Sequence, residues 1–149
     1  MTQRLAWAKA APGAYEAMSA LERYSAAHLD PQLYELVKVR ASLMNGCAFC
    51  VDLHSFDALA AGENPQRLLM ISVWREAPQL YTERERAALA LTEEATRLDE
   101  HGVTDATWAA AAAQFDEKEL ANLLAAVATI NAWNRFGVST RATVRPRPA

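Results

Sequence analysis

Apolar side chains recur every three or four positions along most of the chain, which is the spacing of one face of an α-helix. Two of these apolar stripes are the clearest, and we interpret both as facing the core: Leu33, Leu36, Val37, Leu43 and Met44 in one segment, and Leu120, Leu123, Leu124, Val127 and Ile130 in another. No segment has the pattern of a strand. The pattern predicts helices at 14–28, 31–45, 47–61, 65–76, 83–100, 105–114 and 117–137.

Residues that favour helix ends lie between these segments. Asp30-Pro31 and Asn64-Pro65 each place a preferred N-cap before a proline in the first helical position. Two further starts have the spacing of a capping box, Thr82 with Glu85 and Asp116 with Glu119. Glycine readily adopts the left-handed conformation that ends a helix, so helices are expected to end at these glycines: Gly46, Gly62, Gly102 and Gly137.

Composition supports a helical fold. Alanine occupies 32 of the 149 positions, whereas valine and isoleucine together occupy 10, a balance that favours helix over sheet. We therefore predict an all-α protein. The length fits one domain, residues 1–149, and no linker or repeat divides it. Residues 139–149 are rich in arginine and proline, and we expect them to form a flexible tail or an arm onto a neighbouring subunit.

Charge and hydropathy exclude several classes of partner. The formal net charge is −3, which gives no electrostatic footprint for nucleic acid or an anionic membrane. No apolar stretch approaches the roughly 20 residues of a membrane span. The first residues contain no apolar core ahead of a cleavage site, so we expect no secretory signal and a cytoplasmic protein.

The candidate chemistry is concentrated in the segment N-G-C-A-F-C-V-D-L-H. At 100° per residue, Cys47, Cys50 and His54 fall within about 60° of one another on a single helix face. Gly46 breaks the preceding helix, so both thiols are predicted in the first turn of the next one, where the positive dipole end favours a thiolate. His54 can accept a thiol proton or pair with the thiolate.

Two neighbouring thiols can carry out a redox cycle. A thiolate that attacks a peroxide becomes a sulfenic acid, and a second thiol within reach converts it to a disulfide. The alternatives are two buried structural cysteines or a zinc site, which needs four ligands. His28 and His101 belong to no second ligand cluster, so we predict no metal and no cofactor. A thioredoxin-like site would require a preceding strand.

Two charged residues in the helix before the cysteines are candidates for specific contacts. If the two helices fold back at Gly46, Glu35 and His54 lie at similar depth and can meet. The alternative is that Glu35 is an exposed acid paired with Lys38. Arg40 falls within an apolar stripe, so we expect it to pair with an acid.

The aromatic residues are scattered along the sequence, and we interpret the tryptophans and tyrosines as core or interface anchors. The segment I-N-A-W-N-R-F leaves two possibilities open for Asn131, Trp133, Asn134 and Arg135: they line a cleft, or they lock the last helix in place.

The segment E-L-V-K-V-R-A-S-L-M-N-G-C-A-F-C-V-D-L-H-S-F-D-A-L-A-A-G-E closely resembles the core of the alkyl hydroperoxidase D-like group of the carboxymuconolactone decarboxylase superfamily. The likeness continues through S-V-W-R-E, Y-T-E-R-E-R-A-A-L-A-L-T-E and I-N-A-W-N-R-F, from about residue 15 to residue 137. The resemblance implies an all-helical bundle with the C-x-x-C at a helix N-terminus. It also implies a homo-oligomer, commonly a trimer or hexamer, with a dimer left open.

The same resemblance implies roles for four residues. Cys50 would become the sulfenic acid, Cys47 would be its partner and proton donor, and Glu35 and His54 would form the proton relay. The best-studied members have a histidine between the cysteines, where this chain has Ala48 and Phe49, so any relay through that histidine is absent.

The predicted function is thiol-dependent peroxide reduction in antioxidant defence, with a hydroperoxide substrate and a dithiol reductant. Two alternatives remain. The first is a non-catalytic or redox-sensing helical oligomer. The second is a decarboxylase-like enzyme that uses His54 and Glu35, although the true decarboxylases of the superfamily lack the cysteine pair.

Overall fold

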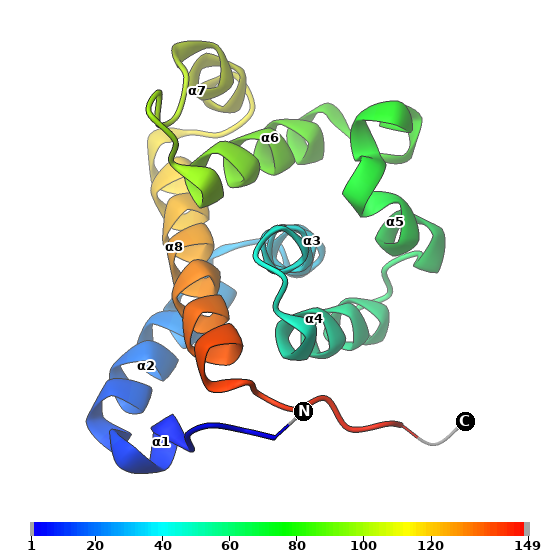
Figure 1. Cartoon of the computed structure of the whole chain (residues 1–149). Helices are drawn as coiled ribbons and strands as arrows, with labels where there is room; N and C mark the ends of the chain where they lie inside the picture. The colour runs from blue at the N-terminus through cyan, green and yellow to red at the C-terminus, as the bar shows by residue number, and fades with distance from the viewer. Residues whose placement is uncertain (1, 148–149) are drawn as a thin grey trace.

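The computed structural model describes residues 2–147, and these residues form helices and no strand (Figure 1). This confirms the all-α prediction. The α-helices are α1 (Trp7–Ala10), α2 (Pro12–His28), α3 (Pro31–Met44), α4 (Ala48–Ala60), α5 (Pro65–Met70), α6 (Glu83–Arg97), α7 (Asp105–Ala112) and α8 (Glu117–Thr140). Two 3₁₀ helices, η1 (Ile71–Glu76) and η2 (Pro78–Leu80), join α5 to α6.

Helix α3 is the central element. Figure 1 shows it end-on, with α4, α5, α6 and α8 arranged around it, and α2 packs along α8. Its apolar residues point to several neighbours, since Val37 faces the cluster shared with α6 and α8, and Leu36 faces the one shared with η1. Both side chains are fully buried. Burial against neighbours in more than one direction explains why the apolar face of α3 is wide.

The four predicted N-caps are confirmed. The side chain of Asp30 accepts a hydrogen bond from the backbone N–H of Leu33, and that of Asn64 accepts one from Gln66. Both predicted capping boxes, at the starts of α6 and α8, are present with their reciprocal hydrogen bonds. These bonds satisfy the first backbone amides of each helix.

The predicted helix at 65–76 is wrong in its second half. The α-helix ends at Met70, and the chain continues as η1, inside which Val73 has the non-helical dihedrals φ −123° and ψ 27°. Side chains three positions apart lie on the same side of a 3₁₀ helix. The tighter turn therefore directs both Ile71 and Trp74 into the core, where both are buried.

Helix α8 does not end at Gly137, contrary to the prediction. It continues to Thr140, and Arg141 takes the left-handed conformation that ends it, with φ 56°. Gly137 has a packing role instead. A Cβ atom at this position would lie 2.7 Å from the Sγ atom of Cys47, so the helix needs glycine here to pass close to that sulfur.

The two terminal segments lie against the end of the bundle. The backbone N–H of Arg4 donates to the carbonyl of Thr140 over 2.8 Å. Residues 141–147 run back to α4, where Arg147 pairs with Asp52 at 2.8 Å and lies over the ring of Phe56. The predicted tail starts too early, because residues 139 and 140 are helical, and residues 148–149 lie outside the described part. Its role as an inter-subunit arm stays a prediction.

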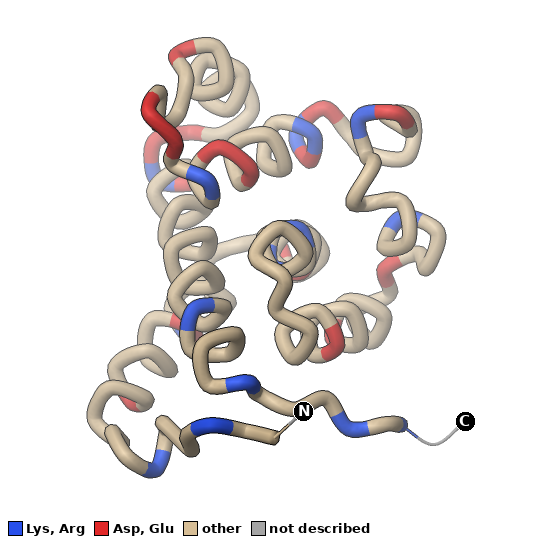
Figure 2. Tube along the Cα trace, in the orientation of Figure 1, with Lys and Arg blue, Asp and Glu red and all other residues tan. Residues whose placement is uncertain are grey.

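Basic residues are concentrated on the two terminal segments (Figure 2). Figure 2 shows basic residues on both terminal segments, whereas acidic residues gather around the end of α6 and the start of α7. Among the described helices, none combines the length and apolar character that a membrane crossing requires.

Candidate active site

The two cysteines lie at the turn between α3 and α4. Gly46 has φ +66°, a conformation that glycine adopts without steric cost, and it lets the chain reverse after α3. Cys47 is the N-cap of α4, and its sulfur accepts the backbone N–H of Cys50 at 3.3 Å. The two residues form a disulfide, so the structure represents the oxidised state of the pair. This matches the predicted position at a helix N-terminus.

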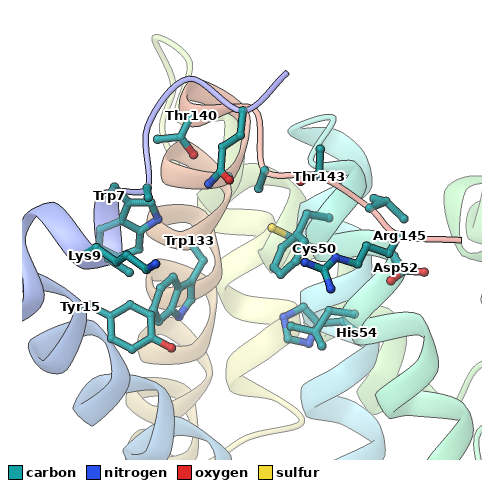
Figure 3. A pocket seen from close by; sticks show the side chains of 18 of the residues that line it. Trp7, Lys9, Tyr15, Cys50, Asp52, His54, Trp133, Thr140, Thr143 and Arg145 are labelled. Atoms are coloured by element: carbon teal, nitrogen blue, oxygen red, sulfur yellow. The ribbon is translucent and has the colours of Figure 1, made fainter. Parts of the chain in front are cut away.

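The two sulfur atoms have different surroundings. Both sulfurs pack near Gly137 of α8, but Cys50 is 4% exposed and lines a cleft of about 960 Å³, whereas Cys47 is 1% exposed and does not line it. Figure 3 shows Cys50 at the cleft with His54 beside it. A reagent that enters the cleft therefore meets Cys50 first.

Glu35 and His54 are brought together by the reversal at Gly46. Nδ1 of His54 lies 3.0 Å from Oε2 of Glu35, and both side chains are largely buried. A carboxylate at this distance accepts the Nδ1 hydrogen, which leaves Nε2 as the ring nitrogen able to accept a proton. His54 lines the same cleft as Cys50, one helical turn away. The alternative pairing of Glu35 with Lys38 is wrong.

Lys38 instead belongs to a cluster that the sequence analysis did not anticipate. Its side chain is 1% exposed, and its amino group pairs with Glu22 of α2. Glu22 also accepts hydrogen bonds from Tyr34 at 2.5 Å and from Nε1 of Trp133 at 2.9 Å. Burial raises the pKa of Glu22, but Lys38 and Tyr34 outweigh it and hold that pKa below its usual range. Burial, and then Glu22, raise the pKa of Tyr34.

Glu22 places a second, fully hydrogen-bonded carboxylate in the wall of the cleft. The sign of this cluster in the sequence is Lys38, a charged residue between the apolar Val37 and Val39. Its partner could not be found from sequence spacing, since Glu22 and Trp133 are 111 positions apart.

An amide network supports the turn that carries the cysteines. Nδ2 of Asn45 donates to the side-chain oxygens of Asn131 and Asn134, both at 2.9 Å, and Asn134 donates to Ser42 at 3.0 Å. These asparagines lock α8 onto the end of α3, while Trp133 of the same segment lines the cleft. In the segment I-N-A-W-N-R-F, the asparagines therefore lock the last helix in place, and the tryptophan lines the cleft. Arg40 pairs with Glu93 at 2.8 Å, which confirms the ion pair expected for it.

One group of potential metal ligands occurs among the described residues. Ligand atoms of Glu35, His54 and Asp57 all lie within 4.8 Å of one another. Asp57 is exposed and its carboxylate is 3.9 Å from Nδ1 of His54, whereas Glu35 is already at hydrogen-bonding distance from that nitrogen. The arrangement is that of a hydrogen-bonded carboxylate–histidine pair with a second acid at its edge.

The helical fold and the C-x-x-C turn at a helix N-terminus place the chain in the alkyl hydroperoxidase D-like structural class. A sequence model of the carboxymuconolactone decarboxylase family matches residues 9–94, and the chain belongs to this family.

Several relatives support this assignment. The chain is 34% identical to the uncharacterized protein YdfG of Bacillus subtilis over 140 residues, which cover 93% of this chain and 95% of that protein. It is 35% identical over 108 residues to the uncharacterized protein YnjA of Escherichia coli, covering 72% of this chain and 58% of the relative.

A solved structure is similar over almost the whole chain. It is the crystal structure of a protein of unknown function from Agrobacterium tumefaciens, with a TM-score of 0.94, 38% identity, and coverage of 98% of this chain and 100% of that one. A role in antioxidant defence, as AhpD, has been suggested for that protein.

Proposed function

We propose that the protein is a thiol-dependent peroxidase of antioxidant defence, which reduces organic hydroperoxides through a Cys47/Cys50 dithiol–disulfide cycle in the cytoplasm. The observation that carries this proposal is the position of the pair, with Cys50 facing a largely apolar cleft and Cys47 beneath it. The family and the suggested antioxidant role of the similar solved structure support it.

The first step uses Cys50 and His54. In the reduced protein, Nε2 of His54 accepts the thiol proton of Cys50, and Glu35 stabilises the imidazolium through Nδ1. The thiolate attacks the distal peroxide oxygen, so an S–O bond forms as the O–O bond breaks. The leaving alkoxide takes the proton and departs as an alcohol, and Cys50 becomes a sulfenic acid.

The second step uses Cys47. Its sulfur attacks the sulfenic sulfur of Cys50, so an S–S bond forms, the S–O bond breaks, and the hydroxide leaves as water with the Cys47 proton. The Cα atoms of the closed pair are 5.3 Å apart, within the usual range of disulfides, so this turn accommodates the bond. A dithiol reductant then returns two electrons and two protons.

Steady-state reduction of cumene hydroperoxide, with dithiothreitol as the reductant, tests the proposal. The parent should turn over, and the Cys50→Ser variant should lose at least about 10²-fold of the rate. Equal rates in the parent and Cys50→Ser would contradict the dithiol cycle. Activity of Cys50→Ser on a carboxymuconolactone, dependent on His54 and Glu35, would establish the decarboxylase alternative. If the parent protein does not reduce the hydroperoxide, the remaining alternative is a redox-sensing or structural role for the cysteine pair.

We also propose that the protein is a homo-oligomer. Phe49, Leu53 and Phe56 follow one another along one side of α4 and are 39–45% exposed, and the first two also line the cleft. Leu69 of α5 is 80% exposed. Exposed apolar side chains of this number on neighbouring helices are typical of a surface between subunits.

A further inference from the structure

The cleft above Cys50 contains two cations without an acidic partner among the described residues. Lys9 of α1 and Arg145 of the C-terminal segment both line the cleft, and both are exposed. Figure 3 shows them on opposite sides of the cavity. They belong to the basic terminal segments in Figure 2.

The acids of the cleft are already neutralised by other groups. Glu22 is bonded to Lys38 and Trp133, and Asp52 is paired with Arg147 at 2.8 Å. The mouth of the cleft is therefore locally positive, although the chain as a whole has a net charge of −3. A positive site on a negative protein favours an anionic group on the ligand.

The wall of the cleft beside Lys9 is aromatic (Figure 3). Trp7, Tyr15 and Trp133 have ring centroids 5.6–5.7 Å apart, and Trp7 also stacks on Phe136 at 3.9 Å. Rings that pack on one another are held in place, so they form a preformed apolar surface. The cleft volume of about 960 Å³ fits a molecule much larger than hydrogen peroxide.

We propose that the cleft binds an organic hydroperoxide that also carries a carboxylate, of the kind formed by oxidation of a fatty acid. The carboxylate pairs with Lys9, the chain lies along the aromatic wall beside it, and the O–O bond reaches Sγ of Cys50, while Arg145 on the opposite side adds to the positive potential of the cleft (Figure 3). This inference rests on the proposed function, and the bond changes are the same: the hydroperoxide is reduced to the hydroxy acid and water, and the two thiols are oxidised to the disulfide.

The test compares a fatty acid hydroperoxide with its methyl ester, through the ratio of their kcat/KM values. We expect the parent to favour the acid. Lys9→Gln should lower the ratio by about 2–5-fold, the range of one partly exposed ion pair, and Arg145→Gln, which removes a more distant positive charge, should lower it by less. Lys118→Gln removes the same charge from the exposed start of α8 and should leave the ratio as in the parent.

A binding measurement separates this inference from the proposed function. Trp7 and Trp133 line the cleft, so their fluorescence should report octanoate, and the parent should bind octanoate more tightly than 1-octanol in a manner that depends on Lys9. If octanoate binds in this way but no hydroperoxide is reduced, the proposed function fails and the assignment of ligand chemistry stands. If cumene hydroperoxide is reduced but octanoate has no advantage over octanol, the inference alone fails.

The reductant is the other possible source of a carboxylate. With cumene hydroperoxide held fixed, a thiol carboxylic acid can be compared with its amide as the electron donor. Two results together would overturn the proposal that the carboxylate belongs to the oxidant. The first is a Lys9-dependent preference for the thiol carboxylic acid over its amide, and the second is an equal kcat/KM for the hydroperoxide acid and its methyl ester.

Discussion

The two cysteines differ in what covers them, and this difference predicts their reactivity. Cys50 lines the cleft, whereas Cys47 is 1% exposed and does not reach it. With one equivalent of peroxide, the Cys47→Ser variant should therefore accumulate a sulfenic acid on Cys50, because no second thiol removes it. A dimedone-type probe and mass spectrometry locate the product. In Cys50→Ser, the probe should label Cys47 about 10-fold more slowly than it labels Cys50 in Cys47→Ser. Equal labelling rates in the two variants would contradict the assignment of roles to the two cysteines.

The Glu35–His54 pair predicts a change in thiol reactivity. Without a proton acceptor, fewer Cys50 thiols are ionised near neutral pH. His54→Ala should slow alkylation of Cys50 in the reduced protein by about 10²–10⁴-fold, and Glu35→Gln should slow it in the same direction by less. Asp57→Asn is the matched control, since Asp57 is exposed and stands 3.9 Å from the imidazole. If only Asp57→Asn slows alkylation, the carboxylate of the relay is Asp57 and not Glu35.

At the scale of helices, the close approach of α8 to the disulfide is a testable packing constraint. In Gly137→Ala the new methyl group meets the Cys47 sulfur, so the oxidised protein should lose about 1–3 kcal/mol of unfolding free energy. Reduction frees the Cys47 side chain to rotate, and the loss should shrink. Thermal unfolding of both redox states measures the difference.

Gly13→Ala supplies the control for this substitution. Gly13 lies in α2 with no atom near its missing Cβ, so alanine there should be neutral or stabilising by up to about 1 kcal/mol. Equal effects at Gly13 and Gly137 in the oxidised protein would show that α8 does not constrain the disulfide.

Glu93 joins three elements, and its ionisation predicts an acid-dependent stability. Trp74 and Arg75 of η1 and Arg40 of α3 all contact its carboxylate. Burial raises the pKa of Glu93, but these contacts outweigh it and lower that pKa below its ordinary value of 4.5. The ionised carboxylate therefore stabilises the fold at neutral pH, and this contribution is lost as the pH falls through the lowered pKa.

Glu93→Gln should lower the free energy of unfolding at pH 7 by about 2–3 kcal/mol, because it leaves the largely buried Arg40 poorly paired. Below about pH 5 the parent should lose stability more steeply than the variant, so the two curves converge. Denaturant unfolding at several pH values measures this, with the exposed Glu16→Gln as the control. Parallel curves for the parent and Glu93→Gln would contradict the assigned role of the ionised carboxylate.

The sequence predicted those parts of the fold that depend on local interactions. The caps at Asp30 and Thr82 depend on residues three positions apart, and the C-x-x-C turn depends on Gly46, so each was visible in the sequence. The break at Met70 and the continuation of α8 past Gly137 depend on tertiary packing, around Ile71 and the disulfide respectively, and local patterns do not contain that information.

The candidate site shows the same division. The approach of Glu35 to His54 followed from a single hairpin between adjacent helices, and spacing alone made it possible. The cleft itself could not be predicted, because Lys9, Glu22 and Trp133 come from three separate elements and meet only in the folded chain.

For the whole molecule, the exposed apolar side of α4 predicts self-association. Light scattering at micromolar concentration should give a mass that is a multiple of 16.4 kDa. Phe56→Glu places a charge on this surface and should lower the mass, whereas Glu16→Lys, at an exposed position of α2, should not. A monomeric mass for the parent would show that this surface has another use.

The most direct test of the dithiol cycle is a single turnover of the fully reduced protein with one equivalent of cumene hydroperoxide. The account predicts that each chain loses two thiols, gains one Cys47–Cys50 disulfide, and releases one equivalent of the alcohol, as counted by thiol titration, peptide mass spectrometry and chromatography. Alcohol formed without loss of the two thiols, or a peroxide left unchanged by a fully reduced protein, would contradict it.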